Sequence, residues 1–495
     1  MGFSCHSLIL KNDGTLWGCG YNSDGELGLG DITNRNTFTQ ITTNSDDIKS
    51  VYCGRIHTII LKNDGTLWST GFNDVGQLGL GDTTQRNTFT QITTNTDNIK
   101  EVYCGSHHTF ILKNDGTLWS TGYNNYGQLG LGDTNYRTTF TQVTTNTNDV
   151  KSVYCGYYNT FILKNDGTLW SCGNNQYGQL GLGDTINRTT FTQITTNTGD
   201  IKEIYCGTYH TFILENDGTL WGTGLNSEGE LGLGNTNNRN TFTQITTNTN
   251  DIKSVYCGWS HTIILKNDGT LWSTGDNSYG QLGLGDTNNR TTFTQVTTNA
   301  DDIKQVCCGL NHTLILENDG TLWGTGYNAD GQLGLGGGGN RYTFTQVTTN
   351  VTNDVKSLSN QYGDIPFITK IYDLNTGLIE TLDTNNFKNI PVDKFEKIKV
   401  LYTNPTDTLI AGLISFDNKA TWKVFDGIQW SNISNLDPDQ ILTKGMSMDK
   451  INNLDKNKLI AGGFTGNMDF KIAMRTNDVN KTPSITKIYI EYKNN

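Results

Sequence analysis

Residues 115–132 read DGTLWSTGYNNYGQLGLG, and near-copies of this stretch occur seven times along the chain. The tryptophan of each copy follows the previous one after 51 residues, at Trp17, Trp68, Trp119, Trp170, Trp221, Trp272 and Trp323. A fixed period of this length is typical of repeat proteins, in which each unit buries its apolar faces against its neighbours. The repeats reach about residue 358 of 495, so a second, different region follows.

Each unit contains four short segments with the alternation of a β-strand, separated by turn residues. In the third unit they are Ile99–Cys104, His108–Lys113, Thr117–Gly122 and Thr139–Thr144. The Asp-Gly pair within residues 113–116 favours a type I′ hairpin turn between the second and third segments. Four antiparallel strands repeated seven times, without helical spacing, predict an all-β fold, a seven-bladed β-propeller.

The two ends of the repeat array complement each other. The first unit lacks its opening strand, because residues 1–3 align with 52–54, whereas a surplus copy of that strand follows the seventh unit at Asp354–Ser359. We expect residues 354–359 to pair with His6–Lys11 and close the first blade, which leaves no strand edge exposed. The first predicted domain is therefore a propeller at 1–360.

The remaining residues, 361–495, lack the repeat and contain all five prolines. We predict a smaller, mostly β, sandwich-like domain. Strand-like runs are Phe367–Tyr372, Leu409–Phe416, Ala420–Asp426, Phe470–Arg475 and Ile485–Tyr492, and residues 441–454 favour a short helix.

Composition and charge argue against several classes of function. With a net charge of −12 and a pI near 5.0, nucleic acid is not an expected partner, since a phosphate-backbone binder needs a clustered basic face. No apolar run approaches the ~20 residues that span a bilayer, so we expect no membrane insertion. The N-terminus lacks the basic segment and apolar core of a secretory signal, which predicts cytoplasmic synthesis. Buried free thiols, and hence a reducing compartment, are expected for the six cysteines that recur with the repeat: Cys53, Cys104, Cys155, Cys206, Cys257 and Cys308.

Motifs that look chemical recur from unit to unit, which favours structural roles. One histidine per unit, replaced by Asn159 in the fourth, is expected to be hydrogen-bonded within its own blade, because equivalent positions lie too far apart to share a metal ion. The Gly-Gln-Leu-Gly-Leu-Gly run lacks the Lys-Ser/Thr of a phosphate loop and predicts a bend with positive φ. Pairs such as Asp133/Arg137 predict surface ion pairs of small worth. No catalytic set is unique to one unit, so we expect no enzyme activity, no metal and no cofactor.

The unit Cys-Gly-x-x-His-Thr, Asn-Asp-Gly-Thr-Leu-Trp and Gly-x-Asn-x-x-Gly-Gln-Leu-Gly-Leu-Gly resembles the regulator of chromosome condensation repeat. The resemblance covers about 358 residues and implies a seven-bladed propeller, here of a bacterial or phage type. It leaves function open, because the family includes a Ran nucleotide exchange factor, a plant ultraviolet-B photoreceptor and a bacterial β-lactamase inhibitor. The photoreceptor's Gly-Trp-x-His unit is matched once, at 258–261. Residues 415–430 loosely resemble β-rich accessory domains of phage tail and fibre proteins.

The seven near-copies also show which positions change. The turn Asn-Asp-Gly-Thr-Leu-Trp is constant, whereas the two positions after Cys-Gly vary, as do the residue before the repeating Asn and the two residues after it. In an antiparallel blade the loops after strands one and three emerge on one face, and those after strands two and four emerge on the other. The variable positions therefore share one face, and the diversified stretch around Asn135-Tyr136 borders it.

This variable set is rich in Tyr, Trp, Phe, Arg and His, the types enriched at protein interfaces. Unconstrained drift is the alternative, but it would favour Asn, Ser, Thr and Asp, as the loop at 146–149 does. The predicted partner-binding residues are Arg55, Ile56, Phe72, Ser106, His107, Tyr123, Tyr126, Tyr157, Tyr158, Tyr177, Tyr209, Trp259, Tyr279, Leu310 and Tyr327.

The sequence thus predicts a non-enzymatic binding protein that recognises a protein or a cell-surface macromolecule through one aromatic-rich face. A phage-tail or other particle-associated receptor binder is one setting, because such proteins leave the cell without a signal peptide. Three alternatives stay open. They are an intracellular regulator or exchange factor of a small GTPase, an inhibitor of a partner enzyme, and an enzyme with its site in the C-terminal domain or across the domain junction.

Overall fold

A computed structural model divides the chain into two compact units, residues 1–367 and 368–495, and each is described by itself. In the first unit it describes residues 6–195, 199–297, 302–348 and 355–359, and in the second it describes the strands. The domain boundary expected after residue 360 stays a prediction, because residues 360–377 lie outside the described part.

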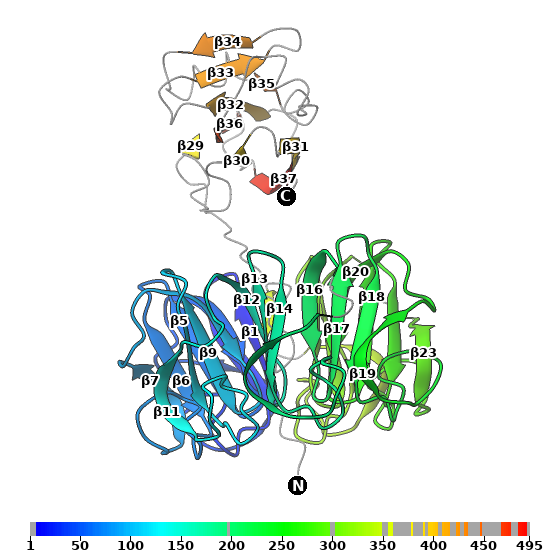
Figure 1. Ribbon diagram of the computed structural model, residues 1–495. Helices are drawn as coiled ribbons and strands as arrows, with labels where there is room; N and C mark the ends of the chain where they lie inside the picture. Colours follow the sequence, from blue (N-terminus) through cyan, green and yellow to red (C-terminus); the bar gives the residue numbers. More distant parts are fainter. Residues whose placement is uncertain are drawn as a thin grey trace. The chain divides into compact units, whose positions relative to one another are not determined.

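The first unit is a seven-bladed β-propeller, as predicted, with four strands in each blade (Figure 1). From blade one to blade seven the first strands are β28 (Val355–Ser359), β4 (Ile48–Cys53), β8 (Ile99–Cys104), β12 (Val150–Cys155), β16 (Ile201–Cys206), β20 (Ile252–Cys257) and β24 (Ile303–Cys308). The second strands are β1 (His6–Lys11), β5 (His57–Lys62), β9 (His108–Lys113), β13 (Asn159–Lys164), β17 (His210–Glu215), β21 (His261–Lys266) and β25 (His312–Glu317). The third strands are β2 (Leu16–Gly20), β6 (Leu67–Gly71), β10 (Leu118–Gly122), β14 (Leu169–Gly173), β18 (Leu220–Gly224), β22 (Leu271–Gly275) and β26 (Leu322–Gly326). The fourth strands are β3 (Arg35–Ile41), β7 (Arg86–Ile92), β11 (Arg137–Val143), β15 (Arg188–Gln193), β19 (Arg239–Ile245), β23 (Arg290–Gln295) and β27 (Arg341–Gln346).

The ring closes through the strand from the far end of the repeats. In blade one, β28 pairs antiparallel with β1, with Ile9 opposite Leu358, and the sheet order is β28-β1-β2-β3. The first strands of neighbouring blades contact one another all round, β24 with β28 and β28 with β4 included, so they form the inner ring. Val355 and Leu358 enter one buried cluster with Ile9 of blade one and residues of blade seven. The closing strand therefore joins the last blade to the first.

The turn after each second strand differs from the expected type. In blade three the Gly116 N–H donates to the Lys113 carbonyl at 3.0 Å, and Gly116 alone within residues 113–116 has a positive φ, +82°. A type I′ turn needs positive φ at both central residues, so that prediction is wrong. The Asp115 carboxylate instead accepts the backbone N–H and the hydroxyl of Thr117, at 2.9 and 2.7 Å. These local bonds favour a type I turn that ends in a left-handed glycine.

Apolar side chains are buried mainly between blades. One cluster joins residues of blade three to residues of blade four: Phe110, Leu112, Leu118, Val143, Val150, Val153, Ile162, Cys172 and Phe191. Trp170 packs against it while only partly buried, and its indole N–H donates to the Thr168 hydroxyl at 2.9 Å. The recurring tryptophans therefore cover the seams between blades, at the edge of the core. The nine cysteines described are thiols outside disulfides; eight of them are buried, and Cys155 is partly buried.

The recurring histidine bonds the next blade and not its own, so the expectation of a bond within each blade is wrong. His57 Nε2 lies 3.0 Å from the Thr109 hydroxyl of blade three, and that hydroxyl donates to the carbonyl of Gln77 at 2.9 Å. An added Cβ on Gly54 would lie 2.0 Å from His57 Cε1. The glycine of each Cys-Gly pair thus leaves room for the imidazole that joins two blades.

The glycine-rich bend has positive φ, as predicted. Gly127, Gly130 and Gly132 have φ of +83°, +69° and +86°. An added Cβ on Gly130 would lie 2.7 Å from the Phe191 ring of the next blade, and the Gly132 N–H donates to the Thr189 carbonyl there at 2.9 Å. The bend is therefore a second connection between adjacent blades.

The second unit contains strands. They are β29 (Leu378–Ile379), β30 (Ile390–Pro391), β31 (Phe395–Thr403), β32 (Thr408–Ser415), β33 (Trp422–Phe425), β34 (Trp430–Ile433), β35 (Met446–Ser447), β36 (Asn467–Thr476) and β37 (Ser484–Tyr492). One sheet has the order β29-β36-β32-β33-β34, and β31 pairs with β37. The helix predicted within 441–454 is wrong for residues 446–447, which form strand β35. The rest of that segment and the predicted strand 367–372 lie outside the described residues. The sandwich stays a prediction. No helix among the described residues is long and apolar enough to cross a membrane.

Candidate protein-binding face

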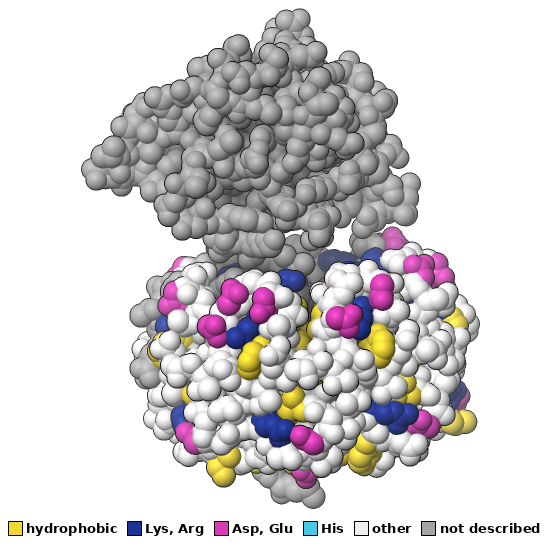
Figure 2. All heavy atoms as spheres, turned by 90° about the vertical axis from the view of Figure 1, so that its left-hand side faces the viewer, with side chains coloured by type: hydrophobic (Ala, Val, Ile, Leu, Met, Phe, Trp, Pro, Cys, Tyr) yellow, Lys and Arg dark blue, Asp and Glu magenta, His cyan; other side chains and the backbone are white. Residues whose placement is uncertain are grey.

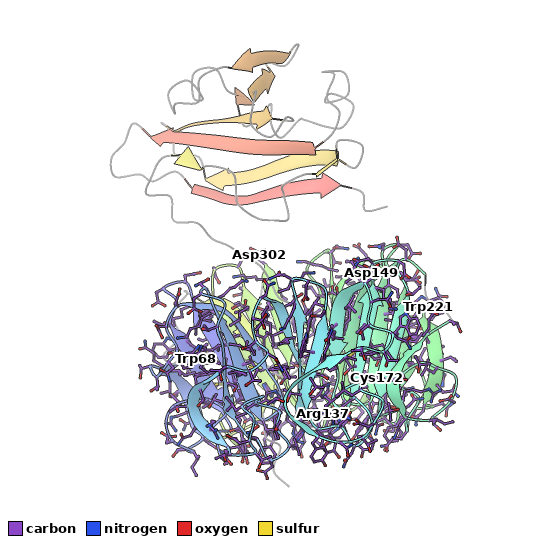
Figure 3. The ribbon with its side chains drawn as sticks, turned by 60° about the vertical axis from the view of Figure 1, so that its left-hand side comes forward. Trp68, Arg137, Asp149, Cys172, Trp221 and Asp302 are labelled. Atoms are coloured by element: carbon purple, nitrogen blue, oxygen red, sulfur yellow. The ribbon has the colours of Figure 1, made fainter. Side chains whose placement is uncertain are left out.

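The loops after the first and third strands of each blade form one face of the propeller, which we call the variable face. In Figure 3, Arg137, which follows a third-strand loop, lies near one rim, whereas Asp149 and Asp302, which precede first strands, lie near the other. This arrangement follows from the antiparallel order of the strands, because alternate connections leave a sheet at opposite ends.

A constant framework holds the variable side chains. The Tyr123 N–H donates to the His107 carbonyl at 2.8 Å, which ties together the two variable loops of blade three. An added Cβ on Gly122 would lie 2.4 Å from that carbonyl oxygen, so only glycine fits there. The repeating Asn124 side chain donates to the Asp133 carbonyl at 3.0 Å and accepts the Leu129 N–H at 3.0 Å, which braces the longer loop. Neighbouring units can therefore change the side chains on these loops without changing the backbone.

Aromatic residues from three adjacent blades meet on this face. Blade three contributes His107, Tyr123, Tyr126 and Tyr136, blade four contributes Tyr157, Tyr158 and Tyr177, and blade five contributes Tyr209; we call these eight residues the tyrosine platform. Each is at least partly exposed, and Tyr136 is 42% exposed.

Tyr158 lies at the centre of the tyrosine platform. Its ring centroid is 4.3 Å from that of Tyr157, 5.0 Å from Tyr123 and 5.2 Å from Tyr126. The layer extends further through Tyr157, whose ring centroid lies 6.0 Å from that of Tyr209. The Tyr209 ring in turn lies 5.1 Å from the Tyr177 ring. These separations are those of favourable aromatic pairs, so the rings support one another in a continuous layer.

A single guanidinium joins this layer. Arg55 of blade two reaches over blade three to blade four, where its Nη1 donates to the Tyr157 hydroxyl. Its guanidinium carbon also lies 5.5 Å from the centre of the Tyr157 ring, a cation–π contact.

Burial favours the uncharged forms of three rings of the tyrosine platform. Burial, followed by the charge of Arg55, lowers the pKa of His107 to about 3. Burial and then neighbouring tyrosines raise the pKa of Tyr209 to about 12, and burial raises the pKa of Tyr158. These three side chains therefore present uncharged π faces near pH 7, and the Arg55 guanidinium is a cation in contact with the tyrosine platform.

The structure sorts the fifteen residues predicted from the sequence. Seven of them belong to the tyrosine platform, with Phe72 beside it at 6.3 Å from His107. Tyr279 and Tyr327 form a separate pair at 5.2 Å on blades six and seven, where Trp259 is also partly exposed. Three of the predicted partner-binding residues are too buried to contact a partner: Ile56, Ser106 and Leu310 are at most 6% exposed. Tyr136, at the far end of its loop, was outside the predicted set and joins the tyrosine platform.

Charged residues at the rim are mostly paired. Five Asp/Arg pairs four residues apart form ion pairs at 2.6–2.7 Å, as expected, and Figure 2 shows acidic and basic side chains lying in such neighbouring spots on a largely uncharged surface. Within the described residues, no group of three or more His, Cys, Asp and Glu side chains is placed to hold a metal ion.

A closed ring of near-identical blades with constant turns on one face and diversified loops on the other defines an RCC1-like propeller. Residues 3–200 match the RCC1-like domain, and residues 201–230, 252–281 and 303–332 match the regulator of chromosome condensation (RCC1) repeat. The chain belongs to the RCC1 repeat family. The bacterial or phage type and the likeness of the C-terminal region to phage proteins stay predictions from the sequence.

Similar proteins come from a plant, a nematode and a yeast. The chain is similar to the ultraviolet-B receptor UVR8 of Arabidopsis thaliana, with 32% identity over 338 residues, which is 67% of this chain and 77% of that one. It is 27% identical over 331 residues to the X-linked retinitis pigmentosa GTPase regulator homolog of Caenorhabditis elegans, covering 58% of this chain and 24% of that protein. Yeast RCC1 (Prp20), solved bound to Kap60, has the same fold at a TM-score of 0.62 and 19% identity, over 73% of this chain and 89% of that one.

Proposed function

We propose that this protein is a non-enzymatic binding protein whose partner, another protein, docks on the variable face around the tyrosine platform. The observation that carries the proposal is the concentration of eight partly exposed aromatic residues from three blades on one face of a constant framework. Pooled tyrosines on a surface supply large, rigid contact areas with hydroxyls for hydrogen bonds, the combination that protein interfaces use.

The test is affinity capture of the natural partner with the full chain and two variants. In Tyr123→Ala/Tyr158→Ala the centre of the tyrosine platform is removed, and we expect capture to fall about tenfold or more. Tyr342→Ala is the matched control, because Tyr342 is 46% exposed at the start of β27 on blade seven. Unchanged capture by the double variant, with an unchanged thermal melt, would place the binding site elsewhere.

Regulation of a small GTPase is the second candidate function. It is supported by the relative named as a GTPase regulator homolog, although the match covers 24% of that protein. Stimulated release of a fluorescent nucleotide from a candidate GTPase would support it, and no stimulation at saturating concentration would exclude it for that GTPase. Enzyme inhibition and the particle-associated receptor setting stay predictions from the sequence.

A further inference from the structure

Three carboxylates lie on the same face as the tyrosine platform, in a row of loops that ends next to it. Asp330, Asp24 and Asp74 are in the third-strand loops of blades seven, one and two, which are consecutive in the closed ring. We call them the acidic arc. Asn34 of blade one donates to Asp330 at 3.2 Å, and Gln85 of blade two donates to the Ser23 carbonyl at 3.5 Å, so the three loops adjoin one another.

The acidic arc is not neutralised by cations of the described chain. None of its three residues forms an ion pair among the described residues, in contrast to the five Asp/Arg pairs of the rim. Asp74 is exposed and Asp24 is partly exposed. Burial, followed by the charge of Asp74, raises the pKa of Asp24, so these two carboxylates repel each other across the seam between blades one and two. A cation bound from outside would relieve that repulsion.

The acidic arc and the tyrosine platform form one surface. Asp74 and Phe72 are two residues apart in the same loop of blade two, and the Phe72 ring lies 6.3 Å from His107 of the tyrosine platform. A ligand that lies across the seam between blades two and three therefore meets carboxylates on one side and tyrosine rings on the other.

The tyrosine platform already holds one guanidinium. Arg55 stacks on Tyr157 and donates to its hydroxyl, which shows the geometry in which these rings accept an arginine. The rings of Tyr123, Tyr126 and Tyr158 have no cation over them among the contacts of the described residues.

We propose that the acidic arc and the tyrosine platform together bind an extended, arginine-bearing segment of the protein partner. The inference rests on the proposed function and adds the chemistry of the partner. Arginine fits both halves of the surface, because its planar guanidinium stacks on aromatic rings and also forms paired hydrogen bonds with carboxylates. Lysine, a compact and strongly hydrated charge, satisfies the carboxylates but stacks less well. Anionic segments and phosphate backbones are repelled by the acidic arc.

The test uses three synthetic ten-residue probes, with glycine alternating with arginine, lysine or glutamate, titrated into the full chain by calorimetry. We expect saturable binding of the arginine probe, binding about threefold weaker for the lysine probe, and none for the glutamate probe. Tyr158→Ala should weaken binding of the arginine probe about fivefold, and Tyr342→Ala should weaken it less than twofold.

A pair of double variants separates local recognition from net charge. Asp24→Asn/Asp74→Asn removes two charges from the acidic arc, and we expect about fivefold weaker binding of the arginine probe. Asp46→Asn/Asp97→Asn removes two charges from the opposite face, where both side chains are 83% exposed, and should change the affinity less than twofold. Equal effects of the two double variants, or preference for the glutamate probe, would overturn the inference.

The natural partner distinguishes this inference from the proposed function. If capture is lost in Tyr123→Ala/Tyr158→Ala but persists in Asp24→Asn/Asp74→Asn, the face binds a partner and the cationic chemistry is wrong. If capture persists in both, the proposed function itself fails.

Discussion

Glu230 is a carboxylate where five of the seven units have glutamine. Its side chain is fully buried, Oε2 accepts the Glu228 N–H at 2.9 Å, and Oε1 has no partner. Burial raises the pKa of Glu230 to about 7. Between its ordinary pKa of 4.5 and pH 7, the unfolded chain ionises this group while the folded chain retains the proton. Stability is therefore lost as the pH rises to 7 and stays low above it.

Replacing Glu230 with glutamine should recover that loss. We expect Glu230→Gln to raise the free energy of unfolding by about 2 kcal/mol at pH 8 and by about half as much at pH 5.5, where less of the ionisation difference has developed. Urea unfolding at the two pH values measures this, and Gln128→Glu in blade three is the reverse control, expected to destabilise at pH 8. A gain of equal size at pH 5.5 would mean that packing, and not ionisation, is responsible.

At the scale of the element, the seam between blades four and five lacks one bond that the other seams have. Asn159 replaces the recurring histidine, is buried, and has neither side-chain polar atom hydrogen-bonded. The corresponding hydroxyl, that of Thr211, still donates to the Gln179 carbonyl at 3.0 Å. In blade five, His210 Nε2 lies 3.1 Å from the Thr262 hydroxyl. This is the hydrogen bond that is missing between Asn159 and Thr211.

We therefore expect Asn159→His to stabilise the fold by about 1–2 kcal/mol, because it supplies a donor for Thr211 and replaces two unpaired buried polar atoms with one, the Nδ1 that is also unpaired in His210. His108→Asn in blade three is the opposite change and should destabilise by a similar amount. Chemical unfolding of both variants measures the effect. A neutral or destabilising Asn159→His would show that the fourth seam has adapted to the smaller side chain.

At the scale of the whole molecule, all seven histidines have pKa values below the ordinary 6.5, with burial as the largest cause in each. The pKa of His6 is lowered to about 4, and five others are lowered to about 3. Above pH 6.5 the histidines are neutral in both the folded and the unfolded state, so they do not change the stability. As the pH falls below 6.5 the unfolded chain binds protons that the folded ring excludes, so stability decreases.

The propeller should consequently lose stability steeply between pH 6.5 and 4. Each histidine contributes a slope of at most about 1.4 kcal/mol per pH unit, and seven act together. Thermal melts at half-unit intervals measure the slope, and His108→Asn should make it shallower. A melting temperature that stays flat to pH 4 would contradict the neutral, buried state of these histidines.

Closure of the ring is also a property of the whole molecule. Leu358 of the closing strand is 3% exposed and packs with Ile9 and Val355. We expect Leu358→Ala to destabilise the propeller by about 2–4 kcal/mol and to make blade one the first site of limited proteolysis. Ile186→Ala, at a side chain 65% exposed, is the control and should stay within about 0.5 kcal/mol. Equal stability of the two variants would show that closure contributes little.

The sequence alone determined the repeat, the number of blades, the closing strand and the face on which the variation lies. These follow from period, strand alternation and the parity of antiparallel connections, which are local properties of each unit. Three details of the propeller could not be predicted in this way. The type I′ turn was overridden by the Asp115 carboxylate, the histidines bond the next blade, and Tyr136 joins residues from another unit.

Only the tertiary structure decided which variable residues meet and which are buried. Tyr123 and Tyr158 belong to different blades, so their contact depends on how adjacent blades pack and on the path of the fourteen-residue loop 123–136. Ile56, Ser106 and Leu310 occupy the same kind of position as residues of the tyrosine platform, yet they are buried. Sequence periodicity places a side chain on a face, whereas packing between blades sets its exposure and its neighbours, because those contacts join residues that lie in different units and far apart in the sequence, as Tyr123 and Tyr158 do.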